Sequence, residues 1–148
     1  MLTVSLVIPI KNSARTLPAC LHALDCLNPA PVEVIVIDNG STDGSLALLQ
    51  AWIEQARGVN VRLLREARPG ASAARNTGIR AARGDIVAFT DSDCVPQSDW
   101  LSHLLAPFDD ADTGAVAGRI AGVFDRTLCE TFCSLYTLQS AGEATTHR

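Results

Sequence analysis

The sequence lacks the long apolar runs that mark membrane-spanning segments. None of its runs approaches the roughly 18–20 apolar residues that a helix needs to cross a bilayer. The opening residues, MLTVSLVIPIK, have no basic leader and no small-residue cleavage site, so we expect no signal peptide. Positive charge is also scarce, because 12 basic residues face 16 acidic ones and the isoelectric point is near 5.2, which argues against general nucleic-acid binding.

Cysteine is present only five times, in irregular positions, which is no disulfide framework and favours a reducing compartment. We therefore expect a cytoplasmic protein, with peripheral membrane association left open. The 47% of hydrophobic residues supply a core, and the 19% of charged residues exclude global disorder. The length of 148 residues fits a single domain, with a core over 1–123 and a helix and frayed tail over 124–148.

Short apolar runs rich in β-branched residues predict strands at 3–10, 32–37 and 85–90, and a weaker run predicts one at 59–64. Residues Val34 to Ile37 place apolar groups on both faces, which is typical of a parallel strand covered by helices on both sides. Apolar residues at helical spacing predict the intervening helices at 17–24, 46–53, 71–83 and 100–105. This alternation predicts a right-handed parallel α/β sheet.

Weaker patterns follow towards the C-terminal end. We expect a further strand over 115–123 and a helix over 128–139, and a frayed end over 140–148. Four apolar residues of this region are expected to form an exposed face that favours a homodimer: Phe124, Phe132, Leu135 and Tyr136.

Polar clusters follow each predicted strand of the sheet. They are Pro9–Asn12, Asp38–Gly44, Arg65–Gly70 and Thr90–Cys94. Ligands of an open parallel sheet bind outside the carboxyl ends of its strands. The four clusters are therefore expected to share one edge of the sheet and one binding site.

Asp91 and Asp93 are the sharpest feature of these clusters. In an extended segment, residues two apart point the same way, so both carboxylates are expected to face one pocket. Two such charges repel unless a cation intervenes, and a hard divalent cation accepts one or two carboxylates together with phosphate oxygens. The alternative is a plain turn after a strand, which Asp and Ser also favour.

The other clusters carry weaker signals. Asp38, followed by Asn39-Gly40-Ser41, could accept a hydrogen bond from the ring N–H of a base, or it could simply belong to a turn in which Ser41 or Thr42 caps the next helix. Arg75 could reach outward as a planar donor, or Arg75 and Asn76 could be a solvated helix surface.

Together these segments resemble the family 2 glycosyltransferases, inverting enzymes with the GT-A fold. The matching stretches are VSLVIPIKN, VIVIDNGSTDGS, RPGASAARNTG and FTDSD, in the order and spacing of that family. The resemblance covers about Val4 to Gly118 and implies the donor-binding, N-terminal portion of such an enzyme, cut short at its C-terminal end. The implied fold is a mostly parallel, Rossmann-like sheet sandwiched by helices.

The resemblance also implies a reaction and a set of binding residues. A sugar would pass from a nucleoside diphosphate sugar, most commonly a UDP-sugar, to an acceptor hydroxyl with inversion, assisted by Mg²⁺ or Mn²⁺. Asp93 would bind the metal with support from Asp91, and Ala117-Gly118 would lie under the sugar. The implied nucleotide-sugar-binding residues are Pro9, Asn12, Asp38, Asn39, Gly40, Arg75, Asn76, Asp91 and Ser92.

An inverting transfer needs a general base to deprotonate the attacking hydroxyl. In the family that carboxylate lies in an E-D or D-D segment beyond the D-x-D strand. Here Asp109-Asp110 comes too early, at the expected end of a surface helix, and Asp125, Glu130 and Glu143 lack the surrounding pattern. We identify no base in this sequence.

Two other functions remain open at this point. One is a non-catalytic nucleotide-sugar-binding remnant, which would share the pocket and lack the base. The other is a haloacid-dehalogenase-like phosphatase, with Asp91 as nucleophile and Asp93 as acid/base. That motif normally opens its domain and needs a downstream lysine, whereas Lys11 is the sole lysine here. No G-x-x-x-x-G-K-[ST] phosphate loop is present.

Overall fold

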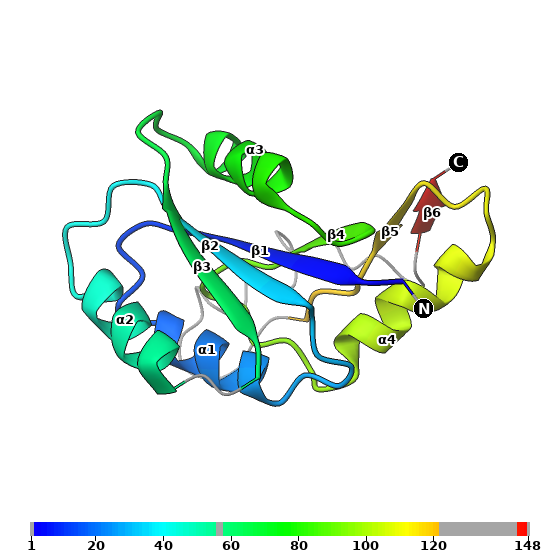
Figure 1. Cartoon of the computed structure of the whole chain (residues 1–148), viewed down its shortest axis with the longest axis horizontal. Coiled ribbons are helices and arrows are strands. Elements are labelled where there is room, and N and C mark those ends of the chain that lie inside the picture. The colour runs from blue at the N-terminus through cyan, green and yellow to red at the C-terminus, as the bar shows by residue number, and fades with distance from the viewer. Residues whose placement is uncertain (1, 56–57, 122–144, 148) are drawn as a thin grey trace, which may run out of the picture. The chain divides into compact units, whose positions relative to one another are not determined.

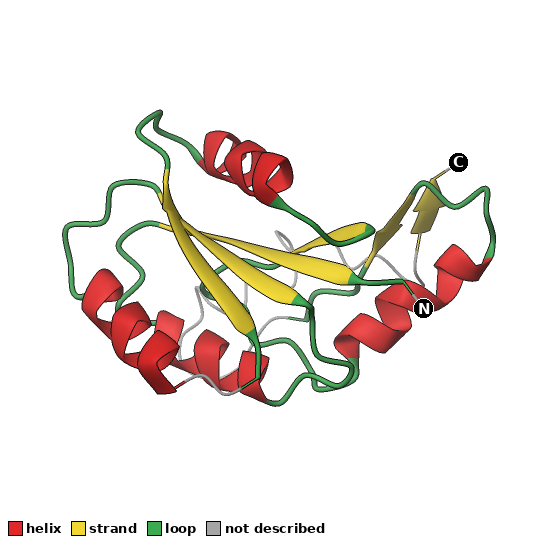
Figure 2. Ribbon diagram, in the orientation of Figure 1, coloured by secondary structure: helices red, strands yellow, loops and turns green. Residues whose placement is uncertain are grey.

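In the computed structural model, β-strands and α-helices alternate along the chain (Figures 1 and 2). The structure describes residues 2–55, 58–121 and 145–147. The alternating elements are β1 (Val4–Ile10), α1 (Leu17–Asp25), β2 (Glu33–Asp38), α2 (Ser45–Gln55), β3 (Asn60–Arg65), α3 (Ala71–Ala81), β4 (Ile86–Phe89) and α4 (Trp100–Leu105). They confirm the predicted strands and helices of this region, with ends that differ by one or a few residues.

The first four strands form one parallel sheet in the order β3-β2-β1-β4. In its register Ile10 pairs with Asp38, and Asp38 with Arg65, so the carboxyl ends of β1, β2 and β3 lie level at one edge. Helix α3 covers one face of the sheet, and α1 and α2 cover the other (Figure 1). The predicted parallel α/β sheet between helices is therefore confirmed.

The core occupies both faces of the two central strands, and all residues of β1 and β2 are buried. On the side of α3, Val7, Ile35 and Ile37 pack with Ala74 of that helix. The residues that alternate with them, among them Leu6 and Ile8, belong to the opposite face. This two-sided burial explains why β1 and β2 are continuous apolar runs.

Helix α3 approaches the sheet closely because it carries a glycine at the contact. A Cβ added to Gly78 would lie 2.4 Å from Val7 Cγ1 and 3.0 Å from Ile37 Cδ1. Ala74, one turn earlier on the same helix, is fully buried. Small residues at positions 74 and 78 therefore determine the distance between α3 and β1.

We expect Gly78→Ala to lower the free energy of unfolding by about 1–3 kcal/mol, because the new methyl group overpacks the contact with Val7. Urea unfolding measures the change. Ser72→Ala, at an exposed position of the same helix, is the matched control and should stabilise slightly through helix propensity. A Gly78→Ala protein as stable as this control would contradict the close approach.

A buried carboxylate closes the opposite, amino-terminal edge of the sheet. Glu33 is 2% exposed, and its Oε1 accepts hydrogen bonds from Ser5 Oγ at 2.8 Å and from the Arg83 N–H at 2.8 Å. Its Oε2 pairs with Arg62 Nη1 at 2.9 Å. Burial raises the pKa of Glu33, but the hydrogen bonds from Arg62, Ser5 and Arg83 outweigh it, so the net pKa is lowered.

A lowered carboxyl pKa stabilises the fold above the pKa of the unfolded chain and ceases to do so as the pH falls through the folded value. At pH 7 we expect Glu33→Gln to reduce the free energy of unfolding by about 1–3 kcal/mol, because it removes the charge facing Arg62. The gap between wild type and variant should shrink as the pH is lowered below about 4. Denaturant titrations at several pH values measure it, and a gap that is independent of pH would contradict this account.

By residue contacts the structure divides into two units, Met1–Leu101 and Ser102–Arg148, which are described separately. This division does not coincide with the predicted end of the core at residue 123, and the assignment of 1–148 to one domain stays a prediction. The second unit contains a 3₁₀ turn over Ala106–Asp109 and an antiparallel pair of strands, β5 (Ala115–Ala117) and β6 (Thr145–His147).

The strand expected over 115–123 is present as β5 but ends at Ala117, since 118–121 continue as irregular chain. The frayed tail expected over 140–148 stays a prediction, and within it residues 145–147 form β6. Pairing with β5 orders this piece, and its two threonines favour a strand. The predicted helix over 128–139 and the apolar residues Phe124, Phe132, Leu135 and Tyr136 lie outside the described residues, so the homodimer stays a prediction.

Within the part of the chain that the structure describes, no helix is both long and apolar enough to cross a bilayer.

Candidate functional site

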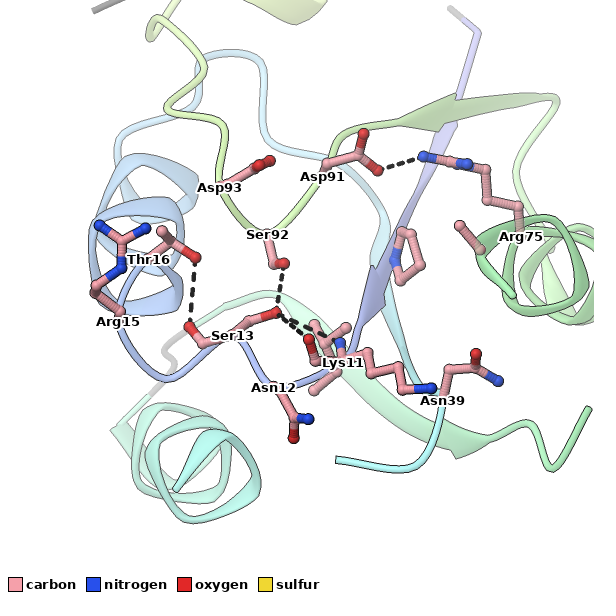
Figure 3. A pocket seen from close by; sticks show the side chains of 13 residues that line it. Lys11, Asn12, Ser13, Arg15, Thr16, Asn39, Arg75, Asp91, Ser92 and Asp93 are labelled. Atoms are coloured by element: carbon pink, nitrogen blue, oxygen red, sulfur yellow. Dashed lines mark hydrogen bonds and ion pairs between the residues drawn. The ribbon is translucent and has the colours of Figure 1, made fainter. Parts of the chain in front are cut away.

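An open cleft of about 490 Å³ lies at the carboxyl edge of the sheet, within the first unit (Figure 3). It gathers residues from the segment after β1, the turn after β2, the start of α3 and the turn after β4. Of the residues predicted to form the site, it brings together Pro9, Asn12, Asn39, Arg75, Asp91, Ser92 and Asp93. Residues of three of the four predicted clusters therefore meet at one edge, and the fourth cluster, Arg65–Gly70, contributes none of the residues that line the cleft.

Three predicted site residues do not line this cleft: Asp38, Gly40 and Asn76. Asp38 is 4% exposed, and its Oδ1 accepts a hydrogen bond from the Ser41 N–H at 3.0 Å. Gly40 stands in the same turn with a φ of +82°, a conformation that glycine adopts at little cost. Asn76 is exposed on α3 beside Arg75. The implied contact of Asp38 with a base stays a prediction.

Asn39 fixes the position of one wall of the cleft. Its Nδ2 donates to the carbonyl oxygens of Glu66 at 2.8 Å and Arg68 at 2.7 Å, and its Oδ1 accepts from the Gly70 N–H at 2.8 Å. These three bonds tie the turn after β2 to the loop that leads into α3. Asn39 therefore acts as a positioning residue for the start of the helix that carries Arg75.

Asn12 and Asp43 hold the segment after β1. Asn12 has a φ of +51°, which asparagine tolerates better than most residues, and its Oδ1 accepts from the Thr42 N–H at 2.8 Å. Asp43 accepts from the Ser45 N–H at 3.0 Å and from the Ala14 N–H at 3.0 Å. Asp43, rather than the predicted Ser41 or Thr42, therefore satisfies the start of α2, because it reaches the first helical N–H and the neighbouring loop together.

The two acidic residues after β4 lie on a turn rather than in an extended segment. The Cys94 N–H donates to the Asp91 carbonyl at 3.0 Å, which closes the turn over Asp91–Cys94. The expectation of an extended D-x-D geometry is therefore wrong, although both carboxylates still line the cleft. Ser92 Oγ lies 2.7 Å from Ser13 Oγ and joins this turn to the segment after β1.

Arg75 and Asp91 form an ion pair across the cleft (Figure 3). The guanidinium Nη2 donates to Asp91 Oδ1, and the side chains are 34% and 51% exposed. A pair so exposed contributes little to stability, roughly 0–1 kcal/mol. Its effect is to hold the first acid of the turn against α3 and to neutralise its charge.

Cys20, on α1, contacts the turn over Asp91–Cys94. Its thiol donates to the Asp91 carbonyl at 3.6 Å. Burial, with smaller contributions from Cys94, Asp93 and Asp91, raises the pKa of Cys20 to about 12. The group is therefore a protonated, unreactive thiol at neutral pH.

Two acids of the cleft, Asp91 and Asp93, are the candidates for holding a cation. Among the residues that the structure describes, no three His, Cys, Asp or Glu side chains come together in a way that would hold a metal. Asp91 and Asp93 nevertheless supply two exposed carboxylates on one turn. Mg²⁺ and Mn²⁺ bind oxygen ligands, and Mg²⁺ commonly uses one or two carboxylates plus phosphates and waters, so this donor set fits such an ion with its ligand.

No described residue is identified as a general base. Asp109 ends the 3₁₀ turn of the second unit, and Asp110, exposed like Asp109, accepts the Asp112 N–H at 3.0 Å. The predicted position at the end of a surface helix is thus confirmed for this pair. Asp125, Glu130 and Glu143 lie outside the described residues.

Sequence analysis missed Lys11, Ser13, Arg15 and Thr16, which also line the cleft. In the predicted cluster after the first strand, only Pro9 and Asn12 were expected to bind a ligand. Lys11 lies inside that cluster, and its position directly before Asn12 was the available signal. Arg15 carried no signal, since a single basic residue in a loop is normally solvated surface.

An open parallel sheet with a polar cleft beyond its carboxyl ends defines the class of α/β proteins that bind nucleotides and related ligands at that edge. Within this class, residues 5–139 match the family described as Glycosyl transferase family 2, so the chain belongs to that family. A curated relative, "Glycosyltransferase AglE" of Haloferax volcanii, is 31% identical over 140 residues, which make up 92% of this chain and 46% of that protein.

Solved structures of glycosyltransferases are also similar to this chain. The mannosyltransferase PcManGT from Pyrobaculum calidifontis, in complex with GDP-Man and Mn²⁺, has a TM-score of 0.74 and 29% identity over 81% of this chain and 36% of that one. S. aureus TarS 1–349, in complex with UDP-GlcNAc, has a TM-score of 0.69 and 25% identity over 85% of this chain and 36% of that one. The chain therefore spans less than half the length of these relatives.

We expect Asn39→Ala to lower the free energy of unfolding by about 1–3 kcal/mol, because it leaves the Gly70 N–H and two carbonyls without their partner. Hydrogen exchange at the Gly70 amide should become faster. The control is Asn76→Ala, which removes an exposed amide on α3 and should change the free energy of unfolding by less than about 0.5 kcal/mol. Equal effects of the two substitutions would show that Asn39 does not hold the loop.

Proposed function

We propose that this chain is the donor-binding part of a glycosyltransferase that transfers a sugar from a nucleoside diphosphate sugar to an acceptor hydroxyl, with inversion at the sugar. The observation that carries the proposal is the meeting of Asn12, Arg75, Asp91 and Asp93 in one cleft at the carboxyl edge of the sheet. Family membership supports the reaction class. The geometry supports the location of the donor.

Each acidic residue has a distinct proposed role. Asp93 holds a divalent cation, Mg²⁺ or Mn²⁺, and Asp91 supports it and the ribose. When bound, such a cation neutralises the diphosphate leaving group as a Lewis acid. The ion pair between Arg75 and Asp91 keeps the two acids of the turn from repelling each other at full strength before the cation binds.

Recognition of the nucleoside is assigned to a second set of residues, which shares Arg75 with the ion pair to Asp91. Pro9, Asn12 and Arg75 line the base and ribose region, with Asp38 proposed to accept the base N–H beside them. Arg75 has five N–H donors and uses one on Asp91, so others remain for a ligand. UDP is the proposed carrier nucleotide, and GDP is the competing one, because the similar structures contain UDP-GlcNAc in one case and GDP-Man in another.

We assign none of the described residues as the general base that deprotonates the acceptor hydroxyl. An inverting displacement needs that base on the side of the sugar opposite the leaving diphosphate, and we assign no carboxylate of the first unit to that position. The alternative proposal is a module that binds the nucleotide sugar without transferring it. Release of free sugar from a UDP-sugar in the presence of the chain would exclude that alternative.

We expect UDP to bind more tightly with Mn²⁺ than without it, and Asp93→Ala to abolish that gain, because Asp93 is the assigned ligand of the cation. Thermal shift with UDP and GDP, each with Mn²⁺ or with a chelator, measures it, since a ligand that binds only the native state raises the melting temperature. Glu54→Ala, an exposed acid at the end of α2, is the control. A Mn²⁺ gain that persists in Asp93→Ala would overturn the assignment of Asp93. Failure of both nucleotides to bind would overturn the proposal itself.

A further inference from the structure

The charges that line the cleft are not balanced. Five charged side chains line it: Lys11, Arg15, Arg75, Asp91 and Asp93. Arg75 and Asp91 neutralise each other in their ion pair. Two positive charges and one negative charge remain, although the chain as a whole has a net charge of −4. The cleft therefore attracts anions on a protein whose overall charge repels them.

The two remaining cations are free to meet a ligand. Lys11 and Arg15 are exposed, and among the residues that the structure describes neither side chain makes a hydrogen bond or an ion pair. Figure 3 shows them on either side of Asn12 and Ser13, with Lys11 extending towards Asn39 and Arg15 beside Thr16. They approach the cleft from two sides of the same loop.

The backbone of this loop is fixed by other groups. Ser13 N–H donates to Ser45 Oγ at 2.8 Å, and Ala14 N–H donates to Asp43 Oδ2 at 3.0 Å. The bonds to Asp43 and Ser45 thus hold the main chain between the two cations, and no described contact ties down their side chains. Cations displayed from a fixed loop lose little backbone freedom on binding a ligand, which is the condition for a preorganised anion site.

We propose that Lys11 and Arg15 bind the phosphate groups of the donor directly, so that the cleft holds a nucleoside diphosphate even without a divalent cation. This inference rests on the proposed function, because it names the part of that ligand the two residues contact. The ammonium of Lys11 offers three donors, and the guanidinium of Arg15 offers a planar fork suited to phosphate oxygens. Neither offers an acceptor, so an uncharged nucleoside gains far less from them.

The test compares UDP with uridine in the presence of a chelator, by calorimetric titration at low and at moderate salt. Wild type should bind UDP at least about tenfold more tightly than uridine, with the advantage falling as salt screens the charges. Lys11→Met and Arg15→Gln should each weaken UDP about tenfold, which is about 1.4 kcal/mol, and leave uridine unchanged. Lys11→Arg keeps the charge and should restore most of the affinity.

Arg83→Gln is the matched control. Arg83 is exposed, and it contributes its backbone N–H to hydrogen bonds at the amino-terminal edge of the sheet, so losing its side-chain charge should leave UDP binding unchanged. If Lys11→Met and Arg15→Gln bind UDP like wild type, or if wild type binds UDP only with Mn²⁺, the inference is overturned and the proposed function stands. If wild type binds UDP under neither condition, the proposed function falls with it.

Chemical labelling gives a second readout because Lys11 is the sole lysine. The aldehyde of pyridoxal 5′-phosphate condenses with its amine to an imine and water, and borohydride reduces the imine to a stable amine that mass spectrometry detects. UDP and pyrophosphate should slow labelling at Lys11, and uridine should not. The chain's α-amino group serves as the internal control. Equal labelling of Lys11 with and without UDP would overturn the inference.

Discussion

Parallel pairing of β1 with both β2 and β4 determines at which edge of the sheet the cleft forms. All residues of β1 are buried, so this strand has to occupy the interior of the sheet. Because both neighbours run in its direction, the segments after the three strands emerge at the same edge. Asn12, Asn39 and Asp93, far apart in the sequence, line one cleft for that reason.

Polar groups at the two edges of the sheet perform different tasks. At the amino-terminal edge, Glu33 is buried and all of its described hydrogen bonds are internal, so it serves stability alone. At the carboxyl edge, the amide of Asn39 and the carboxylate of Asp43 form hydrogen bonds with backbone groups of neighbouring loops. Asn39 and Asp43 thus hold the loops in place. The charged side chains of Lys11, Arg15 and Asp93 stay exposed in the cleft.

The elements of the sheet could be predicted because their signal is local. The apolar run Val34–Ile37 and the helical spacing of Leu17, Leu21 and Leu24 each state a burial pattern within a few residues, and the structure buries them. The common edge also followed, since parallel strands imply it. Beyond residue 115 the pattern is weak, and pairing with a distant strand determines the outcome at 145–147.

The geometry of the site was less predictable because it depends on contacts between distant segments. The D-x-D residues turn because the Cys94 N–H bonds the Asp91 carbonyl, whose other donor is Cys20 on α1. The start of α2 depends on Asp43 reaching back to Ala14, which no capping preference expresses. The positive φ of Asn12, the residue after Lys11, is likewise a property of the folded loop.

Core packing and the charge of the cleft are coupled through α3. Gly78 and Ala74 let this helix approach β1, and Arg75 follows Ala74 in the chain, so the position of its guanidinium depends on that approach. The same guanidinium holds Asp91 on the turn after β4. A change at a buried glycine therefore reaches the acids of the cleft through one helix and one ion pair. Without that pair the five charged side chains of the cleft would still sum to +1, but Asp91 would stand beside Asp93 with no guanidinium held against it.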